Sequence, residues 1–144
     1  MKVFVDDLRK CPERYELFRS AEDFLVWRQK NNDIEIDVLA LDHDLGENCL
    51  NGYELVQELV ESTRMDNIKI IIFHTDNLIG MKNMYYYLSN AQKHGIISKD
   101  IMIDPNKYNC LDGKFTHSLY RVIRDRCYQI ILLLMKLKKK KKKS

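Results

Sequence analysis

The sequence lacks the cysteine spacings that build disulfide frameworks, zinc sites or redox motifs. Its four cysteines form no CxxC pair and stand at no zinc-ligand spacing to histidine; they are Cys11, Cys49, Cys110 and Cys127. We therefore expect four reduced thiols in an intracellular protein. The 144 residues are 45% apolar, and a chain of this length buries about 68% of the surface that its unfolded form exposes. One domain can therefore be stable without a disulfide or a structural metal.

A long apolar run is also missing. The longest one near the end of the chain, Ile130 to Met135, is far shorter than the ~20 residues that cross a bilayer. A strand is predicted from the second residue onward, which leaves no place for a secretory signal. We expect a cytoplasmic protein with no membrane partner.

The folded part has no excess of basic residues. Of the 24 lysine and arginine residues, 7 lie at the end of the chain, at Lys136 and Lys138 to Lys143. The rest of the chain has 17 basic and 21 acidic residues, so its net charge is −4. This balance argues against a nucleic-acid-binding face on the body of the protein. We interpret 138–144 as a lysine-rich disordered tail, with a weak contact to RNA or another anionic partner as the alternative.

Short apolar runs alternate with amphipathic stretches along the chain. We expect strands at 2–5, 15–18, 36–41, 68–73 and 101–103, and helices at 20–31, from 52, around 81–91 and within 116–137. This order predicts an α/β fold: a five-stranded, mostly parallel sheet in a three-layer sandwich with helices on both faces. Residues 8–13 are too few for a good first helix. The expected domains are 1–105, a C-terminal helical extension at 106–137 and the tail.

Acidic residues collect where the predicted strands end. Asp6 and Asp7 follow the first strand, and Asp42 and Asp44 follow the buried third strand. The carboxyl ends of parallel strands form one edge of the sheet, where ligands bind. Carboxylates this close repel one another unless a cation is present, and an all-oxygen set with open positions suits Mg²⁺. We predict Asp6, Asp7 and Asp42 as metal ligands; the alternative is that the acid pair only caps a turn.

Two histidines differ in their expected roles. Side chains alternate along a strand, so His43 points away from Asp42 and Asp44 and is interpreted as structural. His74 leaves the end of an apolar strand toward the acidic edge, where an imidazole can bind phosphate, act as an acid or base, or ligate a metal. Asp42, His74 and Asp44 are therefore the predicted catalytic residues.

A helix start near the acidic edge offers further ligand contacts. Asn77, Gly80, Lys82 and Asn83 surround it. The exposed backbone N–H groups of such a start favour an anion, although an ordinary capped helix explains the same residues. Arg9, two residues after the acid pair, either reaches over the site or lies in solvent.

Four motifs together resemble a known family. They are Asp6-Asp7-Leu8-Arg9, Leu41-Asp-His-Asp-Leu-Gly46, Gly52-Tyr53, and Phe73-His-Thr-Asp-Asn77 with Gly80-Met-Lys-Asn-Met84. Over residues 2 to about 91 this pattern is similar to the cyclic-phosphate processing receiver-like domain, a divergent relative of response-regulator receivers. The resemblance implies a receiver-like (flavodoxin-like) fold without its first helix. It also implies that a cyclic phosphate, on a nucleotide or an RNA end, is bound or processed. The motif positions are Asp6, Asp7, Asp42, His43, Asp44, His74, Asn77, Gly80 and Asn83.

Three functions follow as hypotheses. The first is metal-assisted binding and processing of a cyclic phosphate, with Arg9, His43, Asn77, Gly80, Lys82 and Asn83 meeting the ligand and Mg²⁺ as cofactor. The second is a phospho-accepting switch with Asp42 as acceptor. A receiver resemblance implies a lysine at the end of the last strand for that role, whereas this chain has Asp104 before Pro105. The third is a non-catalytic module that senses a nucleotide.

Overall fold

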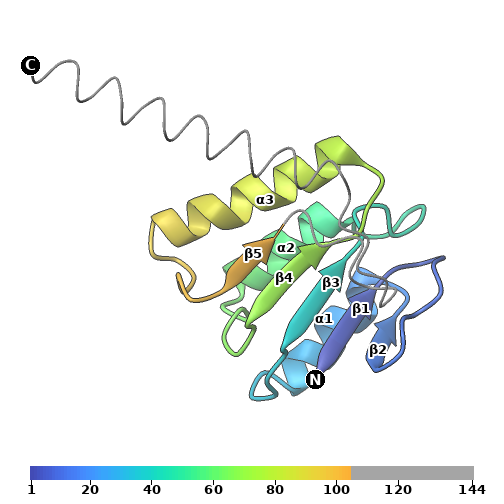
Figure 1. The fold of residues 1–144 in the computed structure, drawn as a ribbon, viewed down its shortest axis with the longest axis horizontal. Coiled ribbons are helices and arrows are strands. Elements are labelled where there is room, and N and C mark those ends of the chain that lie inside the picture. Colours follow the sequence, from blue (N-terminus) through green and yellow to red (C-terminus); the bar gives the residue numbers. More distant parts are fainter. Residues whose placement is uncertain (105–144) are drawn as a thin grey trace, which may run out of the picture. The chain divides into compact units, whose positions relative to one another are not determined.

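The computed structural model describes residues 1–104. The predicted helical extension (106–137) and lysine tail (138–144) lie outside the described residues. The elements run in the predicted order of strands and helices (Figure 1): β1 (Lys2–Val5), β2 (Tyr15–Phe18), α1 (Ala21–Lys30), β3 (Val38–Leu41), α2 (Gly52–Glu61), β4 (Ile70–Phe73), α3 (Leu78–Lys93) and β5 (Met102–Asp104).

The five strands form one sheet in the order β2-β1-β3-β4-β5, and every pairing is parallel. This is the flavodoxin-like order, which reverses direction between β1 and β3, and ligands bind at such a switch point. The predicted receiver-like α/β fold is confirmed. The third and fourth strands are shorter than expected: Ile36 and Ile68 pair only as an isolated bridge ahead of β3 and β4.

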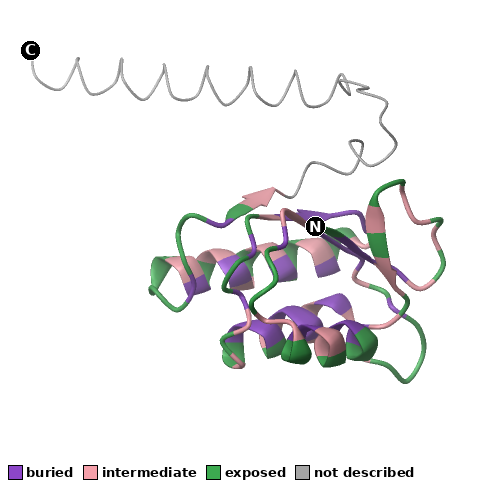
Figure 2. Ribbon diagram, turned by 90° about the horizontal axis from the view of Figure 1, so that it is seen from below, coloured by how far each residue is buried: buried purple, intermediate pink, exposed green. Residues whose placement is uncertain are grey.

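The two faces of the sheet are covered differently. All three helices bury their apolar side chains against the face made by Val3, Leu39 and Ile71, and Figure 2 shows them on the same side of the sheet. Phe4, Ala40 and Ile72 form a smaller cluster on the other face. The sequence predicts helices on both faces; among residues 1–104 no helix covers this second face, because the segment between β1 and β2 has no helix.

Side-chain caps fix where the helices begin. Ser20 Oγ accepts the Asp23 N–H at the start of α1. Asn51 and Glu54 form a complete capping box at the start of α2, and Asn77 Oδ1 accepts the Gly80 N–H at the start of α3. Each cap satisfies a backbone donor that the first turn leaves unpaired. The starts of α2 and α3 are therefore held at the edge of the sheet where β3 and β4 end.

Candidate functional site

Three predicted site residues occupy one row across the sheet. Asp6, Asp42 and His74 each follow the last residue of β1, β3 and β4. Their backbone N–H groups continue the ladder, since Asp42 donates to the Val5 carbonyl and His74 to the Leu41 carbonyl, at 3.1 and 3.0 Å. Because side chains alternate along a strand, the row projects on the side of Phe4, Ala40 and Ile72, away from the helices.

The side chains of this row converge. His74 Nε2 lies 3.0 Å from Asp6 Oδ2, and one ligand atom from each of Asp6, Asp42 and His74 falls within 4.8 Å of the others. All three residues are buried. Such a group of two carboxylates and an imidazole could hold a metal ion. The predicted meeting of carboxylates that are distant in the chain is present in the structure.

Asp6 is saturated with hydrogen-bond donors. Its Oδ1 accepts the backbone N–H groups of Leu8 and Arg9, at 2.9 and 2.6 Å, and its Oδ2 accepts from Arg9 Nη1 and His74. Burial alone would raise the pKa of Asp6, but the hydrogen bonds from Arg9 and Leu8 outweigh it and lower that pKa. Asp6 is therefore a buried, ionised carboxylate that also fixes the turn after β1.

Arg9 lies over the row and joins three carboxylates. Its Nη1 is 3.0 Å from Asp6 Oδ2 and 2.7 Å from Asp42 Oδ2, while its Nη2 is 2.8 Å from Asp76 Oδ2. Arg19 Nη1 in turn donates to the backbone carbonyls of Asp6 and Arg9. Of the two alternatives for Arg9, the structure shows the one in which it reaches over the site.

His74 is enclosed on all sides. Its ring stacks on Phe4, with the centroids 4.2 Å apart, and its side chain has no exposed surface. Because an ionised Asp6 only accepts, His74 Nε2 must carry a proton; Nδ1 is buried without a hydrogen-bond partner. Burial lowers the pKa of His74 in spite of the nearby Asp6, so the ring is neutral. His74 therefore orients Asp6, and its predicted contact with a ligand stays a prediction.

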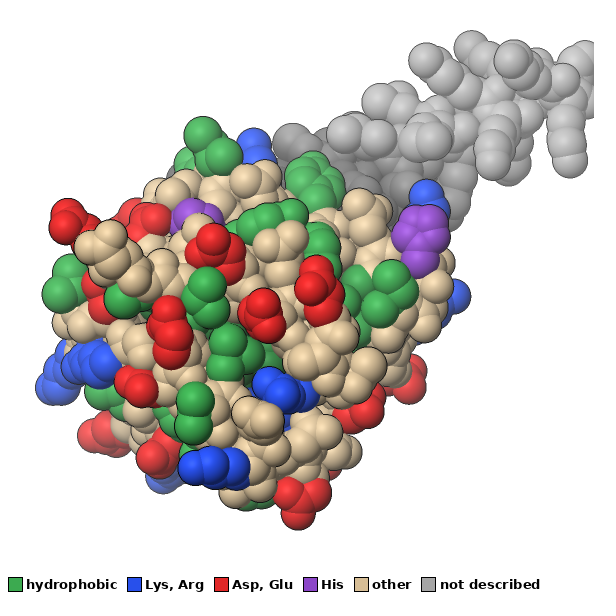
Figure 3. All heavy atoms as spheres, turned by 180° about the vertical axis from the view of Figure 1, so that it is seen from behind, with side chains coloured by type: hydrophobic (Ala, Val, Ile, Leu, Met, Phe, Trp, Pro, Cys, Tyr) green, Lys and Arg blue, Asp and Glu red, His purple; other side chains and the backbone are tan. Residues whose placement is uncertain are grey.

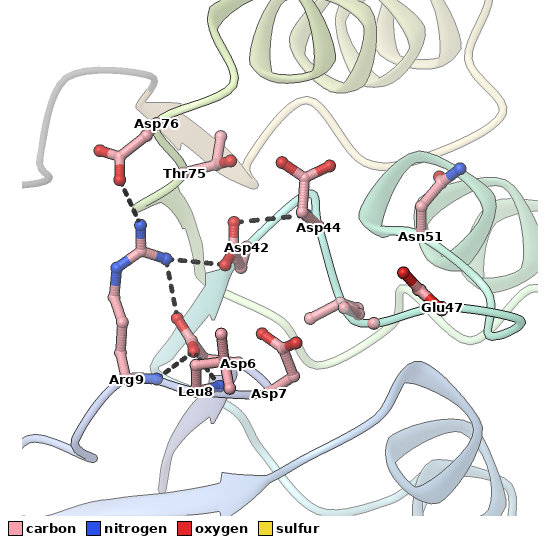
Figure 4. A pocket seen from close by; sticks show the side chains of 12 residues that line it. Asp6, Asp7, Leu8, Arg9, Asp42, Asp44, Glu47, Asn51, Thr75 and Asp76 are labelled. Carbon is pink, nitrogen blue, oxygen red and sulfur yellow. Dashed lines mark hydrogen bonds and ion pairs between the residues drawn. The ribbon is translucent and has the colours of Figure 1, made fainter.

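A cavity of about 560 Å³ opens above the row, between the ends of β1, β3 and β4 (Figure 4). Six carboxylates line it: Asp6, Asp7, Asp42, Asp44, Glu47 and Asp76. Among the described residues that line it, Arg9 has the one basic side chain, and Thr75 and Asn51 add polar groups. The cavity is strongly acidic, so an anionic ligand requires a cation beside it.

Two glycines bring the helices close to the end of β3. A Cβ on Gly52 would overlap the Asp42 carbonyl oxygen, and a Cβ on Gly80 would overlap the His43 ring. His43 Nδ1 lies 2.8 Å from Asp44 Oδ1 and 3.3 Å from the Asn77 amide nitrogen. His43 therefore connects β3 to the start of α3, which agrees with its structural interpretation. The His43 imidazole fills the space beside Gly80.

The other predicted ligand contacts are not among the residues that line the cavity. Lys82 and Asn83 are exposed on α3, and neither they nor His43, Asn77 and Gly80 line it. Asp44 does line it and is 67% exposed; hydrogen bonds from His43 and Asn77 lower the pKa of Asp44. Asp7 lines the cavity too, but the group whose atoms converge contains His74 in its place.

The sequence prediction missed two acidic residues of the cavity, Glu47 and Asp76. Asp76 follows His74 by two residues and so leaves the same strand end toward the same edge. That two-residue spacing is enough to predict Asp76 as a residue of the same edge. Glu47 comes from the loop after β3, where the spacing gives no direction for a side chain.

On the face seen in Figure 3, acidic side chains are spread among neutral ones and basic side chains stand singly or in small groups, so the described part of this face has no continuous basic surface. Within residues 1–104, no helix combines the length and apolarity that crossing a bilayer demands.

Comparison with known families gives one match. A model for the cyclic-phosphate processing receiver domain matches residues 1–90, the part of the chain that contains β1 to β4 and every residue lining the cavity. Searches of curated proteins and of solved structures returned no similar chain. The match spans more than half of the 144 residues, and the chain belongs to the cyclic-phosphate processing receiver domain family.

Proposed function

We propose that this domain binds a cyclic phosphate, on a nucleotide or an RNA end, together with a divalent cation, and opens the phosphate ring. The observation that carries the proposal is the buried row of Asp6, Asp42 and His74, of which Asp6 and Asp42 line an acidic cavity. The family description names cyclic-phosphate processing, which supports the choice of ligand class.

The donor atoms of the row fit a small divalent cation. Two carboxylates that meet within 4.8 Å offer the hard oxygen ligands that Mg²⁺ prefers, and Mg²⁺ keeps several waters when few protein ligands are available. Asp6 and Asp42 would hold the ion, with Asp7 at the cavity wall. When bound, Mg²⁺ would offset charge on the phosphate and polarise its P–O bonds.

Other side chains of the domain have separate roles in binding and in proton transfer. Asp44, mostly exposed and lining the cavity, is the carboxylate that we assign to accept a proton from the attacking water. Its lowered pKa keeps it ionised at neutral pH. Thr75 and Asn51 lie along the same cavity and offer hydrogen bonds to a sugar or phosphate. His74 holds Asp6 in place from below.

Ring opening of a 2′,3′-cyclic phosphate is a hydrolysis. The water oxygen forms a bond to phosphorus, one P–O bond to the sugar breaks, and the departing sugar oxygen takes up a proton. The products are a phosphomonoester and a free hydroxyl, and no oxidant or second substrate is consumed. The reaction therefore needs only water, a proton acceptor and compensation of negative charge.

Incubation of the full chain with 2′,3′-cyclic nucleotides and Mg²⁺, followed by chromatography, tests the proposal. We expect phosphomonoester to form, and to be lost in Asp42→Asn and strongly reduced in Asp44→Asn. Glu58→Gln, which removes an exposed carboxylate from α2 outside the cavity, should retain full turnover. Wild-type protein that gives no product above the Asp42→Asn background contradicts ring opening.

A second function is favoured by one observation. Asp42 and Thr75 line the same cavity, as a phospho-accepting aspartate and a hydroxyl partner would. Against it, β5 ends in Asp104, next to Ile72 in the sheet, and this carboxylate would repel an aspartyl phosphate. Intact-mass measurement after treatment with acetyl phosphate and Mg²⁺ decides between the two functions, because only a phospho-acceptor gains a phosphoryl group.

A further inference from the structure

We propose that Arg9 is the resident counter-cation of the site and competes with divalent metal ions for Asp6 and Asp42. The inference rests on the metal-binding part of the proposed function and is independent of ring opening. It makes Arg9 the residue that sets how tightly the domain binds a metal.

The position of the guanidinium carries the proposal. Arg9 Nη1 lies within 3.0 Å of Asp6 Oδ2 and 2.7 Å of Asp42 Oδ2 (Figure 4). These two carboxylates also belong to the group whose ligand atoms converge within 4.8 Å. A cation bridging Asp6 Oδ2 and Asp42 Oδ2 would need the space that Nη1 occupies. Arginine and metal therefore exclude each other at these oxygens.

Burial makes the ion pairs of Arg9 with Asp6 and Asp42 strong. The side chain of Asp6 is 0% exposed and that of Asp42 is 7% exposed, so neither carboxylate is compensated by bulk water. Removing the partner of a buried charge is strongly destabilising. A cation, either Arg9 or a metal ion, therefore stabilises the two carboxylates, and an exchange between the two cations leaves neither carboxylate without a positive partner.

The ion pair of Arg9 with Asp76 is weak. Asp76, which Arg9 Nη2 contacts, is 83% exposed, and exposed ion pairs contribute little to stability. The backbone of the loop is held independently, because Arg19 donates to the Arg9 and Asp6 carbonyls. The Arg9 side chain can therefore leave the carboxylates while its backbone stays in place, with Asp76 at the cavity wall to receive it.

Arg9→Gln tests the competition without any ligand other than the metal. We expect Arg9→Gln to melt below wild type in EDTA. Mg²⁺ or Mn²⁺ should raise its melting temperature more than that of wild type, and calorimetry should give metal binding about tenfold tighter or more, equivalent to ~1.4 kcal/mol. Lys30→Gln, which removes one positive charge at the exposed end of α1, should behave as wild type.

Two further variants keep the test decisive. Arg9→Lys retains the charge with a single donor group, so it should fold and bind metal with an affinity between wild type and Arg9→Gln. In Arg9→Gln with Asp42→Asn, the gain in metal affinity should disappear. Metal binding by Arg9→Gln and Arg9→Lys that is no tighter than wild type overturns the proposal, as does a gain that persists without Asp42. Failure of ring opening in wild type leaves these outcomes unaffected.

Discussion

At the scale of single residues, the neutral imidazole of His74 links folding stability to pH. Burial lowers the pKa of His74, and its Nδ1 would become a buried donor without an acceptor if it were protonated. The unfolded chain binds this proton near the ordinary pKa of about 6.5. Between that value and the lower folded pKa the unfolded state holds more protons, so stability falls as pH falls.

We therefore expect the free energy of unfolding, measured by urea titration in EDTA, to decrease as the pH is lowered from 7.5 toward 5.5. His74→Gln can still donate to Asp6 but does not titrate, so its stability should change less over this window. His94→Gln, at the exposed C-cap of α3, is the matched control and should follow wild type. Equal pH slopes for His74→Gln and wild type would contradict the prediction, because they would mean that the pKa of His74 is the same in the folded and unfolded states.

The contact between Gly80 and His43 gives a second prediction at this scale. A Cβ at position 80 would overlap the imidazole, and overpacking of this kind reduces stability by about 1–3 kcal/mol. Gly80→Ala should show that loss in urea unfolding, although alanine is the better helix former. In His43→Ala the ring is gone, so adding Gly80→Ala should produce a much smaller loss. Additive losses in the double variant would argue against the contact. Asn90→Ala, exposed on α3, serves as the control.

At the scale of elements, Arg28 connects α1 to the loops that precede β3 and β4, at the end of the sheet opposite to the cavity. Its side chain is fully buried and donates to four backbone carbonyls, those of Arg64, Asn31, Ile34 and Asp66. Arg28→Met would remove these four hydrogen bonds from a buried site, so we expect the free energy of unfolding to fall by about 2–4 kcal/mol. Lys30→Met, exposed in the last turn of α1, should stay within about 0.5 kcal/mol of wild type. Similar losses in both variants would mean that helix propensity, and not the carbonyl contacts, is responsible.

The elements themselves were largely predictable, because alternation of apolar runs with amphipathic stretches fixes strand and helix order. The convergence of Asp6, Asp42 and His74 followed from one rule, that parallel strands align their carboxyl ends. The ion pairs of Arg9 with Asp6, Asp42 and Asp76 did not follow, since a long flexible side chain takes its direction from tertiary packing and not from spacing. The same reason explains Gly80: the sequence shows that space is needed there, and only the structure shows that His43 fills it.

At the scale of the whole domain, the helices cover one face of the sheet and the buried site row projects toward the other. The loop between β1 and β2, which contains no helix, supplies Arg9 to that row. An α-helix after β1 would run back over the sheet. The short loop instead turns at Asp6, whose Oδ1 accepts two backbone N–H groups, and holds Arg9 above the strand ends.

The gathering of carboxylates at one edge also predicts how the domain responds to salt. Six acidic side chains and one arginine line the cavity, so like charges repel across it, and at 0.1 M salt charges are screened beyond about 10 Å. Glu47→Gln removes one exposed carboxylate from this edge. We expect it to melt above wild type at 20 mM NaCl, with a gap that narrows as NaCl is raised to 300 mM. Glu58→Gln removes the same charge from α2 outside the cavity and should show a smaller effect. If both variants shift equally, the net charge of the molecule governs stability and the acidic edge has no special influence.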